Sequence, residues 1–93
     1  MPKLDQTVAR NIVTEAIAIR SNFPQAKIRA DLSIINDLRI DQVSMEGIRK
    51  RISRQVELIG FQAKFSPTDF SKARTVGDLI HVVVSLTESG GPD

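Results

Sequence analysis

Residues 43–59 carry the pattern that most constrains the fold of this chain, a set of apolar side chains spaced three or four residues apart. The set is Met45, Ile48, Ile52, Val56 and Ile59. At about 100° per residue, these side chains fall within an arc of roughly 80°, which is one face of an α-helix. Asp41 precedes the segment as a candidate cap, and Gly60 follows it as a natural stop. The pattern predicts a helix whose apolar stripe faces a core.

Three further helices are predicted, at about residues 5–20, 67–73 and 76–86. In the first, Val8, Ile12, Ala16 and Ile19 fall at helical spacing, with Asp5 or Thr7 as the cap. The second opens with Ser66-Pro67-Thr68-Asp69, which reads as a cap, a proline at the first helical position and an acid in the first turn. Together with residues 43–59, they predict an all-α domain.

Thr75-Val76-Gly77-Asp78 opens the last predicted helix and is similar to a capping box, with Asp in place of the usual Glu. The run Val82-Val83-Val84 is also compatible with a strand. A helix is favoured by the cap and by the helical spacing of five apolar residues, Val76, Leu79, Ile80, Val83 and Leu86. The core predicted for the whole domain is Ile12, Ile48, Ile52, Val56, Leu79, Ile80 and Val83.

A long connection, residues 25–40, joins the first two predicted helices. It is rich in apolar side chains, namely Ile28, Leu32, Ile34, Ile35, Leu38 and Ile40. A connection of this length and composition must pack across the domain. The 93 residues make a single domain. We expect it to span residues 1–87, followed by a disordered polar tail at 88–93.

Several classes of function are excluded by what the chain lacks. It has no cysteine, so a disulfide framework and a thiolate metal site are ruled out. A single histidine, His81, leaves few acid–base or metal options, and we predict neither a catalytic residue nor a metal site. No apolar run approaches the roughly 20 residues that span a bilayer, and the first residues lack a signal pattern. We expect a cytoplasmic monomer that is not an enzyme.

Basic residues gather in the middle of the chain although the net charge is only +2. Lys50, Arg51 and Arg54 lie opposite the apolar stripe of residues 43–59, on the same side as the apolar Val43 and Leu58. Cations beside exposed apolar side chains suggest a docking surface for an acidic partner. A solvated helix face without a partner explains the same charges equally well.

Two stretches resemble motifs of the acyl carrier protein family. Asp37-Leu38-Arg39-Ile40-Asp41-Gln42-Val43 resembles the D-L-G-x-D-S-L signature at the start of that family's second helix. Residues 66–69 and Thr75-Val76-Gly77-Asp78-Leu79-Ile80 are similar to its third helix and the entry to its fourth. The resemblance covers about residues 5–86. It implies a four-helix bundle, three long and one short, that docks on acyl-transfer or biosynthetic enzymes in fatty acid or secondary metabolite biosynthesis.

The sequence departs from the family where the prosthetic group is attached. In the family, the signature serine carries a 4'-phosphopantetheine arm. A gapless match places Gln42 there, and an amide has no hydroxyl to modify; Arg39 also replaces the usual glycine, while Asp41 is retained. A two-residue insertion after Leu38 would make Ser44 the attachment site instead, and the downstream spacing mildly favours it. The resemblance therefore implies either a carrier without an arm or a specialised carrier modified at Ser44, and we favour the first.

The charge of the second helix is a further departure, because this helix is usually acidic in carriers and meets basic partner surfaces. Here Lys50, Arg51 and Arg54 would repel such partners, which argues against the ordinary fatty-acid pathway. We therefore expect a partner with an acidic docking surface. Two alternatives stay open: a bundle unrelated to carriers that binds proteins, and a nucleic-acid module whose phosphates would meet Arg49, Lys50, Arg51 and Arg54. The small net charge and the acids Glu46 and Glu57 count against nucleic acid.

Overall fold

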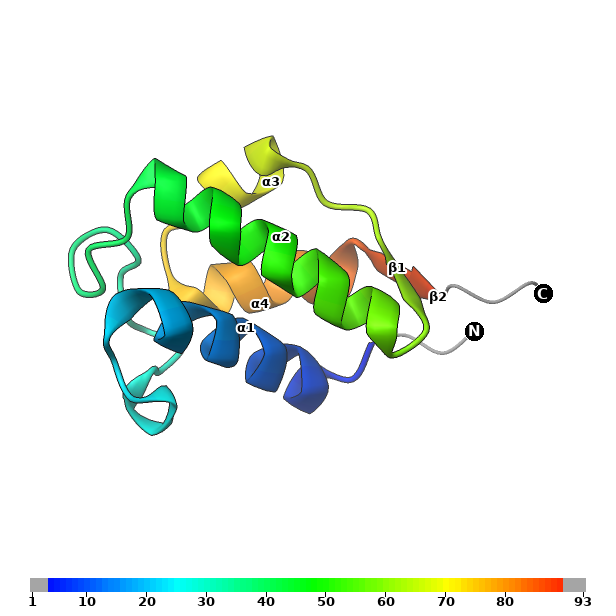
Figure 1. Ribbon diagram of the computed structural model, residues 1–93, viewed down its shortest axis with the longest axis horizontal. Helices are drawn as coiled ribbons and strands as arrows, with labels where there is room; N and C mark the ends of the chain where they lie inside the picture. Colours follow the sequence, from blue (N-terminus) through cyan, green and yellow to red (C-terminus); the bar gives the residue numbers. More distant parts are fainter. Residues whose placement is uncertain (1–3, 90–93) are drawn as a thin grey trace.

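Four helices form a bundle in a computed structural model of the protein, which describes residues 4–89 (Figure 1). They are α1 (Gln6–Ser21), α2 (Gln42–Leu58), α3 (Pro67–Ser71) and α4 (Val76–Ser85), with a short 3₁₀ turn, η1 (Gln25–Lys27), after α1. Helix α1 packs against both α2 and α4, and the short α3 packs across α2. The all-α bundle predicted from the sequence is confirmed, as is the helical state of Val82 to Val84.

Two short strands, β1 (Phe61–Ala63) and β2 (Thr87–Ser89), add a small antiparallel sheet. Phe61 pairs with Ser89, Gln62 with Glu88 and Ala63 with Thr87. The sequence does not predict this sheet, because strands of three residues show too little alternation to be recognised. Glu88 and Ser89 belong to β2, whereas they were expected to begin a disordered tail. The rest of that expected tail, residues 90–93, lies outside the described residues.

The core combines all four helices with the loop before α2. Six of the seven predicted core residues are buried: Ile48, Ile52, Val56, Leu79, Ile80 and Val83. Ile12 is only half-buried and packs against the edge of the core. The two ends of the apolar stripe of α2 are less buried than its middle. Met45 is half-buried, and Ile59 is 48% exposed because the helix stops at Leu58 and Ile59 is its C-terminal cap.

The buried face of α1 differs from the predicted one. Val8 and Ile19, expected in the stripe, are exposed, and the helix instead buries Ala9, Val13, Thr14, Ala16 and Ile17. Helix α1 carries apolar residues around more than half of its circumference, so two stripes offset by one residue both fit helical spacing. Thr14 is tolerated inside because its hydroxyl donates to the carbonyl of Arg10 at 2.7 Å.

The connection between α1 and α2 packs across one end of the bundle, as its apolar content predicts. Ile28, Ile34, Leu38 and Ile40 are buried. The loop also pairs with the start of α4: the Ile34 N–H donates to the carbonyl of Arg74 at 2.9 Å, and the Gly77 N–H donates to that of Ala30 at 2.8 Å. These hydrogen bonds give partners to backbone groups that would otherwise be buried without any. They also hold the loop in place ahead of the first turn of α2.

The helix boundaries agree with the predicted ones to within one or two residues, because polar caps mark where the helices begin. Asp5, rather than Thr7, caps α1. Complete capping boxes open α3, between Ser66 and Asp69, and α4, between Thr75 and Asp78. Gly60 follows α2 with φ of 95°, a left-handed conformation that glycine adopts readily.

Acid is expected to destabilise the fold because three of these capping groups are carboxylates. Hydrogen bonds from the backbone lower the pKa of each: Ser44 acts on Asp41, Ser66 on Asp69, and Arg74 on Asp78. A carboxyl group whose pKa is lower in the folded state stabilises the protein above its unfolded-state pKa, about 3.9 for aspartate. This contribution is lost as the pH falls through the folded-state values.

Thermal unfolding followed from neutral pH down to about pH 2 measures this effect. The triple variant Asp41→Asn, Asp69→Asn and Asp78→Asn should show a smaller fall in Tm, since it lacks the titrating groups. Asp31→Asn is the matched control, because Asp31 is an exposed carboxylate that pairs with Arg29 at 3.4 Å. A triple variant that loses as much Tm as the wild type would contradict the prediction.

Candidate functional site

The first turn of α2 holds the residues to which the sequence resemblance assigns a role. Asp41 has an extended backbone and caps the helix, with its Oδ1 accepting from the Ser44 N–H at 2.7 Å. Gln42 is the first helical residue, and its side chain is exposed. The residue that follows the Asp41 cap is therefore an amide without a nucleophilic hydroxyl.

Arg39 has φ of 54°, the left-handed conformation that residues with a side chain seldom adopt. The family signature has glycine at this position in the gapless match, and glycine reaches that conformation without strain. The backbone at Arg39 therefore takes a conformation that glycine would adopt more easily than arginine.

Ser44 lies at the third position of α2 and is half-buried. Its N–H is already committed to the Asp41 carboxylate, so it adds no free donor for a phosphate. A site for attachment needs an exposed hydroxyl beside unpaired N–H groups. Ser44 meets these needs less well than an exposed serine at position 42 would.

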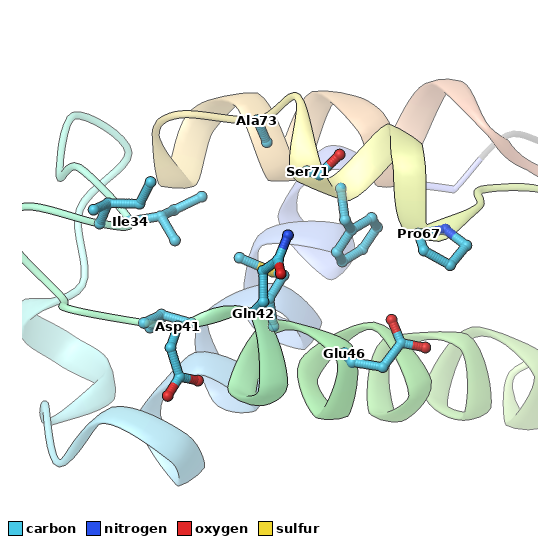
Figure 2. A pocket seen from close by; sticks show the side chains of 11 residues that line it. Ile34, Asp41, Gln42, Glu46, Pro67, Ser71 and Ala73 are labelled. Atoms are coloured by element: carbon cyan, nitrogen blue, oxygen red, sulfur yellow. The ribbon is translucent and has the colours of Figure 1, made fainter.

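A cleft of about 500 Å³ opens between the first turn of α2, the preceding loop and α3 (Figure 2). Its walls are mostly apolar and include Ile34, Ile40, Met45, Phe70 and Ala73. Figure 2 shows the Gln42 side chain pointing across the cleft toward α3, whereas the Asp41 carboxylate points away from it. Besides the apolar side chains, the cleft is lined by the Gln42 amide, the Glu46 carboxylate and the Ser71 hydroxyl. Its apolar part suits packing or the binding of an apolar group.

The outer face of α2 carries the predicted docking residues, and the structure exposes all of them. We call this set, Val43, Lys50, Arg51, Arg54 and Leu58, the docking face. Val43 is 80% exposed and Leu58 is 69% exposed, unusually high values for large apolar side chains. Exposed apolar groups beside cations are typical of surfaces that bind other proteins.

Two of the basic residues of α2 are already paired. Arg49 is half-buried and binds the Glu46 carboxylate, with Nε 3.2 Å from Oε2. This contact lowers the pKa of Glu46 and raises that of Arg49. Arg51 forms an ion pair of 3.0 Å with Glu15 of α1. Of the four cations in the nucleic-acid alternative, only Lys50 and Arg54 form no ion pair within residues 4–89.

Arg20 and Gly47 also contribute to the surface on the outer side of α2, and the sequence pattern does not reveal either of them. Arg20 lies in the last turn of α1, and its guanidinium rests against α2 at Gly47. Together with Lys50, Val43, Gln42 and Glu46 they line an open groove of about 530 Å³ on the outer side of α2. The only sequence signal was a glycine inside a predicted helix, which often marks a close approach. The contact between Gly47 and Arg20 could not be predicted without knowing that α1 and α2 pack together.

Other kinds of site find little support in the part of the chain that the structure describes. Within residues 4–89, no three His, Asp or Glu side chains converge to hold a metal ion. None of the helices there combines the length and the apolar character needed to cross a bilayer. His81 is exposed on α4, with its Nε2 3.4 Å from the Ser85 hydroxyl.

Comparison of the chain with protein-family models, with curated proteins and with solved structures found no match. The functional interpretation therefore rests on the residues and on their geometry.

Proposed function

We propose that this chain is an acyl-carrier-like protein that has no catalytic role and acts by docking on partner proteins, without a phosphopantetheine arm. The observation that carries the proposal is the start of α2. A left-handed residue, Arg39, is followed by the Asp41 cap and then by Gln42 as the first helical residue. The carrier resemblance places glycine, aspartate and serine at these three positions, so the local backbone fits the family while the attachment chemistry is missing.

The proposed partners are acyl-transfer or biosynthetic enzymes that present acidic side chains to the docking face. Lys50 and Arg54, which form no ion pair within residues 4–89, supply positive charge. Val43 and Leu58 supply apolar contact. Charge of the opposite sign on the partner would speed its association and fix its orientation. A cytoplasmic location and a monomeric state belong to the same proposal.

Reversing two charges on the docking face is expected to weaken partner binding by about tenfold at low ionic strength. The variant is Lys50→Glu with Arg54→Glu. Both side chains are exposed, so the fold should be unaffected. The measurement compares the proteins retained from a cell extract by the wild type and by the variant, then titrates each purified partner at several salt concentrations. For the wild type, affinity should fall with salt, and for the variant this dependence should be flatter.

Lys64→Glu with Lys72→Glu is a matched control, since both lysines are exposed but lie outside α2. It should keep the partner. Partners that bind both variants as well as the wild type would contradict the proposal. Tight binding of DNA or RNA with a steep salt dependence would favour the nucleic-acid alternative instead.

A further inference from the structure

Gly47 lies in the middle of α2, where glycine weakens a helix relative to alanine. A Cβ atom placed on it would lie 2.5 Å from Nη2, 2.6 Å from Cζ and 3.1 Å from Nε of Arg20. These distances are shorter than van der Waals contact, so the guanidinium occupies the space that a side chain at position 47 would fill. The missing side chain is therefore what allows Arg20 to lie flat on α2.

Two cations line the groove over Gly47, Arg20 from α1 and Lys50 from α2. Neither forms an ion pair within residues 4–89. Glu46 lines the same groove, and its carboxylate accepts a hydrogen bond from Arg49. The groove over Gly47 thus carries an excess of positive charge that the described part of the chain does not neutralise.

The shape of these donors favours a carboxylate. An arginine guanidinium presents parallel N–H groups that match the two oxygens of a carboxylate, and a lysine adds a point charge. Val43, on the same groove and 80% exposed, offers an apolar contact beside the charges. Two cations that share the groove with the carboxylate of Glu46 suit one acidic side chain better than a run of phosphates.

We propose that the groove over Gly47 is the acid-binding centre of the docking face, and that Arg20 and Lys50 hold one carboxylate of a partner protein there. The occupant is an Asp or Glu next to an apolar residue, which rests on Val43. This inference depends on the proposed docking function and names the chemistry of its partner. Gly47 acts as a positioning residue, because it allows the Arg20 guanidinium to lie beside the carboxylate.

The substitution Gly47→Ala is expected to weaken binding while it raises the stability of the fold. The added methyl group must push the Arg20 guanidinium out of the groove, which is easy for the end of a flexible side chain. Alanine should at the same time raise Tm by about 4–8 °C, because it favours the helix. Binding of an acidic probe should weaken by about 5–10-fold, since the paired N–H donors are lost.

The probe is a synthetic amphipathic peptide whose one face carries leucine and glutamate, titrated into isotope-labelled protein and followed by backbone amide shifts. Arg20→Ala should weaken binding as much as Gly47→Ala, and the double variant no more than either, because both act through one guanidinium. Ser53→Ala, on α2 but away from the groove, is the matched control. The same peptide with glutamine in place of glutamate should bind more weakly than the original.

Three results would overturn the inference. They are unchanged peptide binding in Gly47→Ala, additive losses in the double variant, and equal binding of the glutamine peptide. If Lys50→Glu with Arg54→Glu still weakens partner binding by about tenfold in that case, the docking function stands and only the groove is wrongly assigned. If neither that variant nor Gly47→Ala affects any partner, the docking function itself fails.

Discussion

Replacing Ile52 with alanine is expected to lower the free energy of unfolding by about 2–5 kcal/mol. Ile52 is at the centre of α2 and is fully buried, with 0% of its surface exposed. The loss combines the transfer free energy of the removed methyl groups with the cavity left among close-packed neighbours. A domain of this size has a total stability of about 5–14 kcal/mol, so one substitution would remove a large share of it.

Leu58→Ala is the matched control, because it removes a similar volume from the same helix at a position that is 69% exposed. Its effect should stay within about 0.5 kcal/mol. Urea unfolding of the wild type and both variants, with the midpoint and the slope fitted separately, gives the two differences. Equal losses for Ile52→Ala and Leu58→Ala would mean that the inward face of α2 has been wrongly assigned.

The helices were largely predictable because local signals mark both their faces and their ends. Asp41, Ser66 and Thr75 each cap the helix that the sequence predicts there. A side chain that bonds to the N–H groups of the next turn acts over three residues, so its effect can be read from the sequence. The apolar stripe of α2 is equally local, and Ile48, Ile52 and Val56 are buried as expected.

Features that depend on contacts between distant segments were missed. The sheet joins Phe61–Ala63 to Thr87–Ser89, segments that are separated by two helices. In α1, the choice between the stripe with Val8 and Ile19 and the stripe with Val13 and Ile17 depends on how α1 sits against α2 and α4. Helical spacing alone leaves that rotation undetermined.

The features of the candidate site divide in the same way, into those that follow from local sequence and those that depend on helix packing. The exposure of Val43, Lys50 and Leu58 follows from the helical wheel of α2 and was predicted. The pairing of Arg51 with Glu15, and the position of Arg20 over Gly47, arise from the packing of two helices and could not be predicted. Packing thus reduces the unpaired charge of α2 itself and brings in a cation from α1.

Replacing Gln42 with serine is expected to convert a chain that carries no phosphopantetheine into one that carries a single copy. Serine at this exposed first helical position would place a hydroxyl directly after the Asp41 cap, as in the family signature. Because the basic outer face of α2 would repel a transferase that grips acidic helices, Lys50→Glu and Arg54→Glu are added to the variant.

Ser44→Ala in the same background is the control and should leave the gain in mass intact, because Ser44 is not the expected attachment point. No gain in the Gln42→Ser variant, even with the two charges reversed, would count against the resemblance to carriers. In that case the chain would be better described as a protein-binding bundle unrelated to them.

Intact-mass spectrometry of the wild-type protein, co-expressed with a broad-specificity phosphopantetheinyl transferase, distinguishes a chain without an arm from a working carrier. We expect the mass of the unmodified chain, since Gln42 has no hydroxyl and the basic face of α2 would disfavour the transferase. A gain of one phosphopantetheine that disappears in Ser44→Ala would contradict it. That result would mean that the signature is shifted by two residues and that the protein is a working carrier.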